Sequence, residues 1–262
     1  MDPTTETPPR GLLDPRAGDG LYRESFIPPA AGLGDIVAHH WAVHWDLRGR
    51  APHVVEVLPH PAVILVVENG QCRVHGVLRG RFSDALAGEG DIFGTTFRPA
   101  GFHPLFGRSV AALTDRVRPG AELFGPAADL FAARIAAAPV DDRAALAEEF
   151  VRHRLSPPAP VVALVNEIVD EVLADREILR VDDLTARFGI GKRNLQKLFR
   201  EHIGVSPKWV IQRYRLHEAA QRLDSADADL ATVAAELGYA DQAHFARDFK
   251  SATGRPPATY RG

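Results

Sequence analysis

The sequence predicts an α+β fold in two domains, a β-rich, barrel-like N-terminal domain with helices and an all-α C-terminal domain. Between residues 37 and 97, short runs of alternating apolar and polar residues separated by turn residues are typical of strands. After residue 160, apolar residues recur every three or four positions, as in amphipathic helices. Because Pro157, Pro158 and Pro160 interrupt the helical pattern between the two parts, we expect the domain boundary there.

The domain limits follow from composition. Residues 1–20 contain Asp, Thr, Pro and Gly without an apolar core, which predicts a disordered tail and neither a signal peptide nor an anchor. We expect the β-rich domain over residues 21–156 and the helical domain over residues 157–262. The longest apolar run, Ala62–Val67, is too short to span a bilayer. The single Cys72 excludes an internal disulfide, so we expect a cytoplasmic protein without membrane contact.

Several strands and two helices are predicted in the N-terminal part. Asn69-Gly70 lies between two strand candidates and predicts a tight hairpin. Strands this short, with turns this frequent, indicate a small barrel or sandwich, which we describe as cupin-like. The strand candidates are Val37–Leu47, Val54–Leu58, Ala62–Glu68, Cys72–Leu78, Phe82–Ala87 and Asp91–Phe97, and the Ala-rich helices are expected near Ala121–Ala137 and Asp141–Arg154.

The alternation in Val37–Leu47 predicts two distinct faces. One face carries Val37, His39, Trp41, Val43, Trp45 and Leu47, and the other carries His40, Ala42, His44 and Asp46.

The C-terminal part contains a repeated pattern of helix, glycine and second helix. In the second unit, over residues 229–250, Asp229 is placed to cap a helix, Gly238 ends it, and Asp241 caps the next helix. The first unit, over residues 181–203, repeats this plan with Asp182 or Asp183 as the cap and Gly189 at the turn. Glycine adopts the left-handed backbone of such a turn without steric cost. The pattern therefore predicts two helix-turn-helix units.

A single helix is expected to connect the two units. Ser206 and Pro207 provide an N-cap and a first helical residue, and the helix continues to about Leu223. At 1.5 Å per residue this helix is roughly 24 Å long, which could hold two recognition helices about one DNA turn, roughly 34 Å, apart.

The outer faces of the two second helices carry side chains that hydrogen-bond to bases and phosphates. Residues 187–222 contain nine Lys or Arg and two acidic residues, an excess suited to a phosphate-facing surface. The outward positions are Arg193, Gln196, Lys197 and Arg200 in the first unit, and Gln242, Ala243, His244 and Arg247 in the second. The alternative interpretation is an ordinary solvated helix face, and the repeated unit favours the nucleic-acid interpretation.

The spaced residues of the C-terminal part resemble the AraC/XylS family of transcription regulators. The resemblance covers about Val161 to Arg261. It rests on Arg193–Phe199 (RNLQKLF), Gly204-Val205-Ser206-Pro207, Arg215-Leu216 with Ala219, Gly238-Tyr239 with Phe245, and Arg247–Lys250 through Tyr260-Arg261.

The resemblance implies a seven-helix domain that binds double-stranded promoter DNA as two linked units. The base-contacting positions carry over onto Arg193, Gln196, Lys197, Gln242, His244 and Arg247. Lys192, Arg200 and Lys250 are better suited to phosphate contacts. Ala243 occupies a further contact position at which it cannot donate a hydrogen bond.

The N-terminal part gives weaker signals. Gly90–Gly107, Leu113–Arg116 and His40-Trp41 near Trp45-Asp46 resemble the sensing half of AraC-type regulators without a settled ligand. We expect this domain to bind a small organic effector, to dimerise, or both, and the protein to contact RNA polymerase. A pocket could be lined by Trp41, Trp45, Phe97, Arg98, Phe102 and His103. The alternative is that these aromatic residues belong to the core.

Two other classes of protein were weighed. Seven histidines before Pro104 raise the possibility of a cupin-like metal-dependent enzyme fused to a DNA-binding domain. Because His40 and His44 would lie about 13 Å apart on one strand, we expect neither a metal site nor a cofactor. A fused DNA-repair methyltransferase needs a reactive cysteine and often a thiolate cluster, which one Cys does not favour. We therefore expect no enzyme activity.

Overall fold

The computed structural model describes residues 11, 13, 18–156, 159–223 and 229–260. Most of the predicted tail and residues 157–158 of the linker lie outside these residues. Leu13 is an exception: it is buried against Leu58, and its N–H donates to the carbonyl of Glu56. At Leu13 the structure differs from the disorder that the composition predicts.

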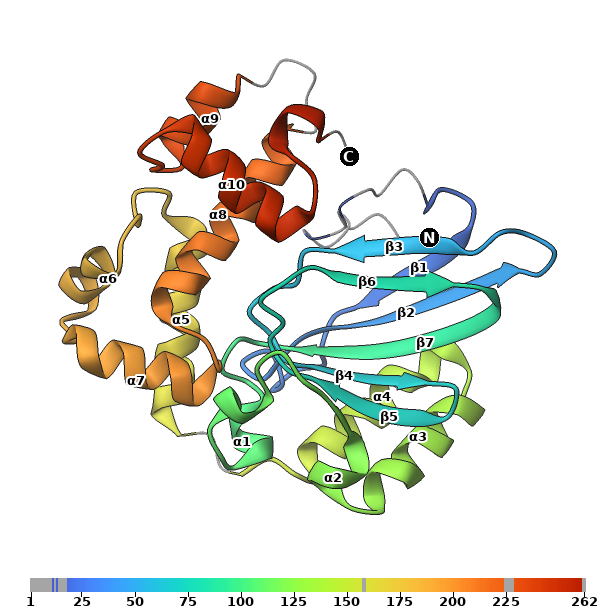
Figure 1. The fold of residues 1–262 in the computed structure, drawn as a ribbon. Coiled ribbons are helices and arrows are strands. Elements are labelled where there is room, and N and C mark those ends of the chain that lie inside the picture. The colour runs from blue at the N-terminus through green and yellow to red at the C-terminus, as the bar shows by residue number, and fades with distance from the viewer. Residues whose placement is uncertain (1–10, 12, 14–17, 157–158, 224–228, 261–262) are drawn as a thin grey trace.

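The N-terminal domain contains a six-stranded antiparallel sheet in the order β1-β2-β7-β4-β5-β8 and a separate pair, β3-β6 (Figure 1). The strands of the larger sheet are β1 (Tyr22–Ile27), β2 (Val37–Leu47), β7 (Gly88–Phe97), β4 (Ile64–Glu68), β5 (Gln71–His75) and β8 (Val117–Pro119). β3 (His53–Val57) pairs with β6 (Phe82–Leu86). The predicted barrel-like class is confirmed as this two-sheet arrangement, while β1 and β8 were not predicted.

The Asn-Gly hairpin is confirmed. Asn69 and Gly70 have φ of 49° and 69°, the left-handed pair that a two-residue turn requires, and Glu68 pairs directly with Gln71.

Both faces of β2 are covered. Trp45 and Leu47 pack with Leu86 of β6, whereas Ala42 packs in the core beneath the helices. Trp45, Leu47 and Ala42 lie on the faces of β2 that the alternation predicts. Val37 does not, because it lies in the same core as Ala42. A register shift between Val37 and His39 is the reason, because a bulge moves the preceding side chain to the other face.

Helices cover the second face of the larger sheet (Figure 1). They are α2 (Gly120–Phe124), α3 (Ala127–Ala137) and α4 (Val140–Arg152), while α1 (His103–Phe106) and the 3-10 turn η2 (Val110–Leu113) lie at the end of the sheet toward the C-terminal helices. The prediction of one helix over Ala121–Ala137 is wrong, because Gly125 takes a left-handed φ of 64° and Pro126 cannot donate the hydrogen bond that would continue α2. The strand expected over Cys72–Leu78 ends at His75.

The C-terminal domain is helical throughout its described residues. Its elements are α5 (Pro160–Ala174), α6 (Val181–Phe188), α7 (Lys192–His202), α8 (Pro207–Leu223), α9 (Leu230–Glu236), α10 (Gln242–Thr253) and the 3-10 turn η3 (Pro257–Thr259). Gly189 and Gly238 have φ of 64° and 73°, as the two turns require. No helix in the described ranges is long and apolar enough to cross a membrane.

Helix capping agrees with the sequence in the second unit and differs in the first. The carboxylates of Asp229 and Asp241 accept from the N–H groups of Thr232 and His244, as predicted. In the first unit the N-cap residue is Arg180. Asp183, the third residue of α6, accepts a hydrogen bond from the backbone N–H of Arg180. The cap prediction was therefore two or three residues too late.

Buried histidines predict a loss of stability in acid. Burial lowers the pKa of His39 to about 4, with smaller effects of His60 and His40, and burial also lowers the pKa of His75 and His202. The unfolded chain, with histidine pKa near 6.5, then binds more protons than the folded chain. The contribution of these neutral histidines to the free energy of unfolding is complete above about pH 6.5 and is lost as the pH falls toward about 4.

Glu24 changes stability with pH in the opposite direction, because burial raises its pKa to about 7. Its contribution is complete below about pH 4.5 and is lost as the pH rises through 7. Burial lowers the pKa of His40 as well, so four histidines stand against one Glu, and we expect the urea midpoint at pH 5.5 to lie below that at pH 7.5. His39→Gln should flatten this slope, and His44→Gln, at an exposed position of the same strand, should leave it unchanged. Equal midpoints at the two pH values would contradict the prediction.

Candidate DNA-binding surface

The outer face of α7 is free of core contacts. Leu195 and Phe199 are fully buried, and Ile203 beyond the helix is buried with them. Arg193, Gln196, Lys197 and Arg200 are exposed at the i, i+3, i+4 and i+7 positions, so they share one face of the helix. The four predicted contact residues of the first unit therefore lie together on solvent.

α10 presents a similar face in the second unit. Phe245 and Phe249 are fully buried, their ring centroids 5.6 Å apart, and hold the helix against its own small core. Gln242, His244, Arg247 and Lys250 are exposed, with Ala243 between the first two. His244 lies 3.5 Å from the half-buried carboxylate of Asp248.

The cations on these two faces lack acidic partners. Within the described ranges, no Asp or Glu oxygen lies within 4 Å of the charged nitrogens of Arg193, Lys197, Arg200, Arg247 or Lys250. Lys192 differs, because its Nζ lies 2.9 Å from Asp182. An exposed pair of this kind contributes at most about 1 kcal/mol, so a phosphate could replace the carboxylate.

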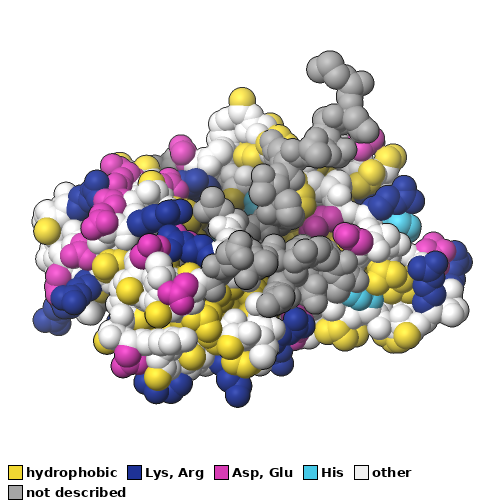
Figure 2. Space-filling model, turned by 90° about the horizontal axis from the view of Figure 1, so that it is seen from above, with side chains coloured by type: hydrophobic (Ala, Val, Ile, Leu, Met, Phe, Trp, Pro, Cys, Tyr) yellow, Lys and Arg dark blue, Asp and Glu magenta, His cyan; other side chains and the backbone are white. Residues whose placement is uncertain are grey.

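Charge over the rest of the helical domain is mixed. Figure 2 shows the upper face, on which Lys and Arg alternate with Asp and Glu over the helical half at the left. Residues 161–262 hold 15 Lys or Arg and 15 Asp or Glu, so the domain as a whole is neutral. The unpaired cations of α7 and α10 are therefore a local feature of these two helices and not a property of the whole domain.

α8 is the rigid connection between the units. Its 17 residues correspond to roughly 26 Å. Arg222 near its end pairs with Glu236 of α9 and with Glu218 of α8, while Arg215 donates to the carbonyl of Ile178 before α6. One helix thus holds both units through side chains at its middle and end.

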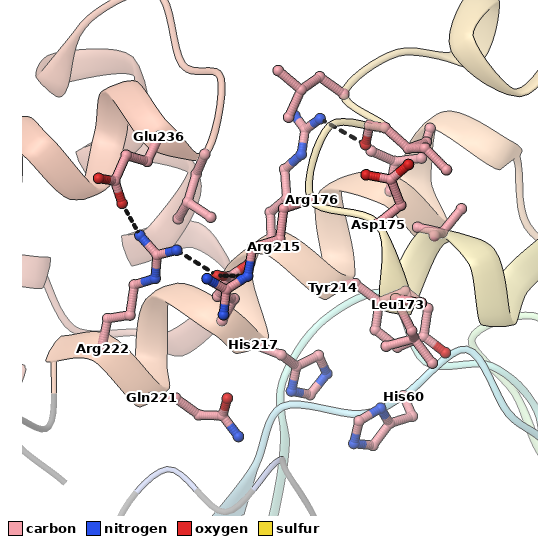
Figure 3. Close-up of a pocket in the computed structure, with 17 residues that line it drawn as sticks. His60, Leu173, Asp175, Arg176, Tyr214, Arg215, His217, Gln221, Arg222 and Glu236 are labelled. Atoms are coloured by element: carbon pink, nitrogen blue, oxygen red, sulfur yellow. Dashed lines mark hydrogen bonds and ion pairs between the residues drawn. The ribbon is translucent and has the colours of Figure 1, made fainter.

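A polar cleft of about 220 Å³ lies between the end of α5, α8 and α9 (Figure 3). Tyr214, His217 and Arg222 contribute from α8, and His60 contributes from the N-terminal domain. Burial raises the pKa of Tyr214, with a smaller effect of Asp170, so its hydroxyl stays protonated.

The residues of the predicted effector pocket lie in several places, none of them in the lining of this cleft. Trp45 packs in the small core with Leu86, and the Trp41 indole covers Gly94, where a Cβ would come within 2.1 Å of the ring. Phe97 and Phe102 are fully buried, with ring centroids 5.0 Å apart.

Arg98 and His103 lie at the domain boundary instead. Arg98 pairs with Asp170 of α5 at 2.5 Å, and His103 stacks on His202 of α7. The core interpretation fits Trp45, Phe97 and Phe102, and the effector pocket stays a prediction. Among the described residues, no three His, Cys, Asp or Glu side chains are grouped as metal ligands.

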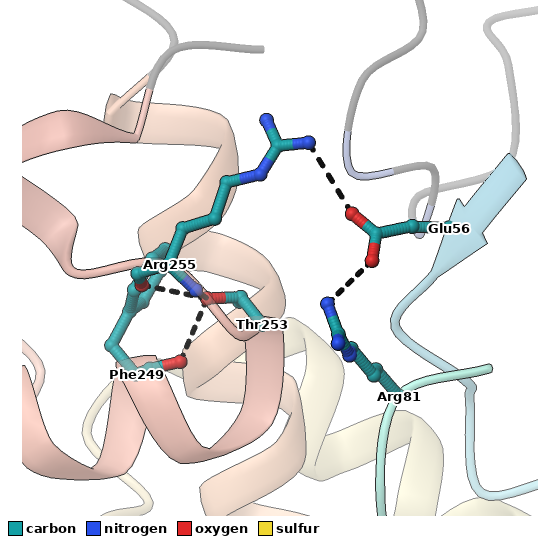
Figure 4. A network of polar contacts seen from close by, with 5 residues as sticks. All are labelled: Glu56, Arg81, Phe249, Thr253 and Arg255. Atoms are coloured by element: carbon teal, nitrogen blue, oxygen red, sulfur yellow. Dashed lines mark hydrogen bonds and ion pairs between the residues drawn. The ribbon is translucent and has the colours of Figure 1, made fainter. Parts of the chain in front are cut away.

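Contacts between the domains were not predicted. Glu56 of β3 pairs with Arg81 and, at 3.3 Å, with Arg255, which follows α10 (Figure 4). The buried Arg213 of α8 donates to the carbonyl of Arg79, and burial lowers its pKa to about 10. These partners are up to 199 residues apart, and no local pattern in the sequence signals them.

Comparison with known proteins agrees with this geometry. A family model described as a helix-turn-helix domain matches residues 184–262, and one described as a domain of unknown function matches residues 25–119. The probable transcription factor PqrA of Proteus vulgaris is 30% identical over 101 residues, which are 37% of this chain and 83% of that protein. The chain belongs to the AraC/XylS family.

Another relative matches over a smaller share of its own length. The transcriptional activator RhaS of Pectobacterium carotovorum is 33% identical over 78 residues, 30% of this chain and 28% of RhaS. The chain therefore spans little more than a quarter of that relative.

Two solved structures are also similar. The AraC-type regulator from Chromobacterium violaceum is 24% identical with a TM-score of 0.36, covering 40% of this chain and 94% of that one. ToxT from Vibrio cholerae is 14% identical with a TM-score of 0.38, covering 76% and 84%.

Proposed function

We propose that this protein regulates transcription by binding double-stranded promoter DNA in the cytoplasm, with α7 and α10 entering successive segments of the major groove. The observation that carries the proposal is the repeated arrangement. Each unit presents, on the exposed side of its second helix, cations without a carboxylate partner among the described residues. Membership of the AraC/XylS family supports the same function.

The six predicted base-contacting residues are assigned as follows. Arg193 and Arg247 suit guanine, because a guanidinium donates two parallel hydrogen bonds to O6 and N7. Gln196 and Gln242 suit adenine, and Lys197 and His244 can donate to acceptors on either purine. Lys192, Arg200 and Lys250 are assigned to phosphates, where they position the helices without reading sequence.

The N-terminal domain is proposed as the controlling part. It contacts α5, α8 and Arg255 beyond the end of α10, so a change in this domain would reach both units. We infer that a small organic effector, dimerisation, or both act through these contacts on DNA affinity or on a contact with RNA polymerase.

A footprint with the intact protein tests the proposal. Because α8 could hold the two recognition helices about one turn of DNA apart, we expect two protected blocks on one face of the duplex, centred about ten base pairs apart. Genome-wide mapping of bound DNA supplies the promoter fragments. A single block, or binding no tighter than to bulk genomic DNA, would contradict the two-unit mode.

A further inference from the structure

A segment of the N-terminal domain packs against the C-terminal end of α7. Ser109 Oγ donates to the carbonyl of Arg200 at 3.4 Å, and Thr114 Oγ1 donates to the carbonyl of Gly204 at 2.7 Å. η2, which lies between these two side chains in the sequence, contacts α7. A Cβ on Gly204 would come within 3.1 Å of the carbonyl oxygen of Val110. The N-terminal domain is therefore fixed directly beside the recognition helix of the first unit.

Arg108, the residue before Ser109, is an exposed cation at this junction. Its guanidinium carbon lies 4.5 Å from the centroid of the Phe106 ring, at the end of α1. Within the described ranges, no Asp or Glu oxygen lies within 4 Å of the charged nitrogens of Arg108. The N-terminal domain thus places a positive charge without a carboxylate partner next to the end of α7.

Two carboxylates at the same junction have other neighbours. Glu201 of α7 lies 3.8 Å from the imidazole of His103, and Asp115 pairs with Arg79 at 2.6 Å. Neither of them neutralises Arg108, so the charge of Arg108 is available to an anion from outside the molecule.

The position of Arg108 corresponds to the DNA backbone at the edge of the groove. α7 has 11 residues and is roughly 16 Å long, whereas the major groove is about 12 Å wide. A helix that enters this groove by its N-terminal residues leaves its C-terminal end near the sugar–phosphate backbone. Arg200, in the last turn of α7, is assigned to a phosphate there. Because Ser109 contacts the carbonyl of Arg200, the neighbouring Arg108 can reach a phosphate beside that of Arg200.

The second unit has a related arrangement in which the cation is neutralised. A Cβ on Gly254, the residue after α10, would come within 2.5 Å of the guanidinium of Arg81 in the N-terminal domain. The N–H of Gly254 donates to the carbonyl of Lys250 at 2.8 Å. Arg81 pairs with Glu56, so it offers an anion less charge than Arg108 does. We therefore assign a DNA contact of the N-terminal domain to the end of α7 and not to the end of α10.

We propose that the N-terminal domain is part of the DNA interface, with Arg108 bound to a phosphate of the backbone strand at the C-terminal end of α7. This contact rests on the proposed function, because it needs α7 in the major groove. A guanidinium at a phosphate adds affinity without reading sequence. It also makes affinity depend on the position of the N-terminal domain, since a shift of this domain away from α7 would remove the contact.

The salt dependence of binding counts phosphate contacts. Each contact contributes about −0.9 to the slope of log K against log salt concentration, because counterions are released from the DNA. Arg108→Ala in the intact protein should make this slope less steep by about 0.9. At about 0.1 M salt it should weaken binding roughly three- to tenfold, equally on a promoter fragment and on bulk genomic DNA. Fluorescence anisotropy of labelled DNA at several NaCl concentrations measures both quantities.

Two further variants separate a phosphate contact from a structural role of Arg108. Arg108→Lys keeps the charge and should keep the slope, because an ammonium also binds phosphate. Arg50→Ala removes an exposed arginine of the same domain, in the loop between β2 and β3. That loop lies at the end of the sheet remote from the helical domain, so this variant should leave the slope unchanged (Figure 1).

A cleavage reagent attached at the same position tests the contact directly. Arg108→Cys carries an iron–EDTA group on its thiol, which generates hydroxyl radicals that cut the nearby DNA backbone. Cys72 is buried and burial raises its pKa to about 12, so it does not compete for the reagent. Cuts are expected at the edge of the protected block that Phe199→Ala removes, and Arg50→Cys should give none.

Three results would exclude the contact: an unchanged slope in Arg108→Ala, an equal change of slope in Arg108→Lys, or no cuts above the level of Arg50→Cys. The contact and the proposed function fail separately. If Arg108→Ala keeps its slope while the protein protects two blocks, the proposed function stands without this contact. If no promoter is bound more tightly than bulk DNA, the proposed function fails. The slope on bulk DNA then still tests Arg108, because a phosphate contact does not depend on sequence.

Discussion

Replacing Arg193 and Arg247 together by alanine is expected to weaken specific promoter binding about a thousandfold. Both side chains are exposed on the faces of α7 and α10 proposed to meet DNA. Loss of one bidentate contact to guanine costs about 1–3 kcal/mol, and effects at well-separated sites add. Two losses of about 2 kcal/mol each correspond to roughly a factor of a thousand. Titration of a labelled promoter fragment at fixed salt measures the change.

The matched control is Arg50→Ala, an exposed arginine in the loop between β2 and β3. It removes one such charge far from both recognition helices, as each single variant does, and should leave affinity within twofold. Each single variant should bind the specific fragment with tenfold to a hundredfold lower affinity, and its affinity for bulk DNA should fall much less. If the double variant bound its promoter as tightly as Arg50→Ala, neither arginine would contact a base.

The helical domain could be predicted from sequence because its signals are local. Glycine at the turns, Asp229 and Asp241 as caps, and apolar residues at i and i+4 each concern residues within one or two turns of helix. The exposure of Arg193 and Arg247 follows from the same periodicity. The hairpin at Asn69-Gly70 is local in the same sense, since its conformation is fixed by the two turn residues.

Elements that depend on distant partners could not be predicted. β8 has three residues and exists through its pairing with β5, and β1 exists through its pairing with β2. Val37 changes face because of a bulge that alternation alone does not reveal. The aromatic residues Phe97 and Phe102 are equally suited to a pocket or a core, and only their packing against each other decides their burial.

The division of the core into two parts explains how the domains interact. Leu195 and Phe199 of α7 belong to a core continuous with the N-terminal sheet and helices. Phe245 and Phe249 of α10 belong to a separate core that includes Leu58 of the N-terminal domain. Each helix-turn-helix unit is therefore packed on a different part of the N-terminal domain, so one change in that domain can move the two units unequally.

Phe249→Ala is expected to remove the second unit from DNA while leaving the first in place. Phe249 is fully buried, and its ring lies 5.1 Å from that of Tyr260. Truncation of a buried Phe costs about 3–5 kcal/mol, or roughly 10 °C of melting temperature in a chain of this size. Because the core around Phe199 is separate, the footprint should lose one of its two blocks and keep the other.

Two further variants determine whether this loss is specific to the unit. Phe199→Ala should remove the opposite block, since it disrupts the core behind α7. Val54→Ala, at a side chain 55% exposed, removes two methyl groups without a cavity and should change neither block nor melting temperature. If Phe249→Ala and Phe199→Ala each abolished both blocks at a temperature where the variant remains folded, the units would not bind DNA independently. The separation of the two cores would then have no effect on DNA binding.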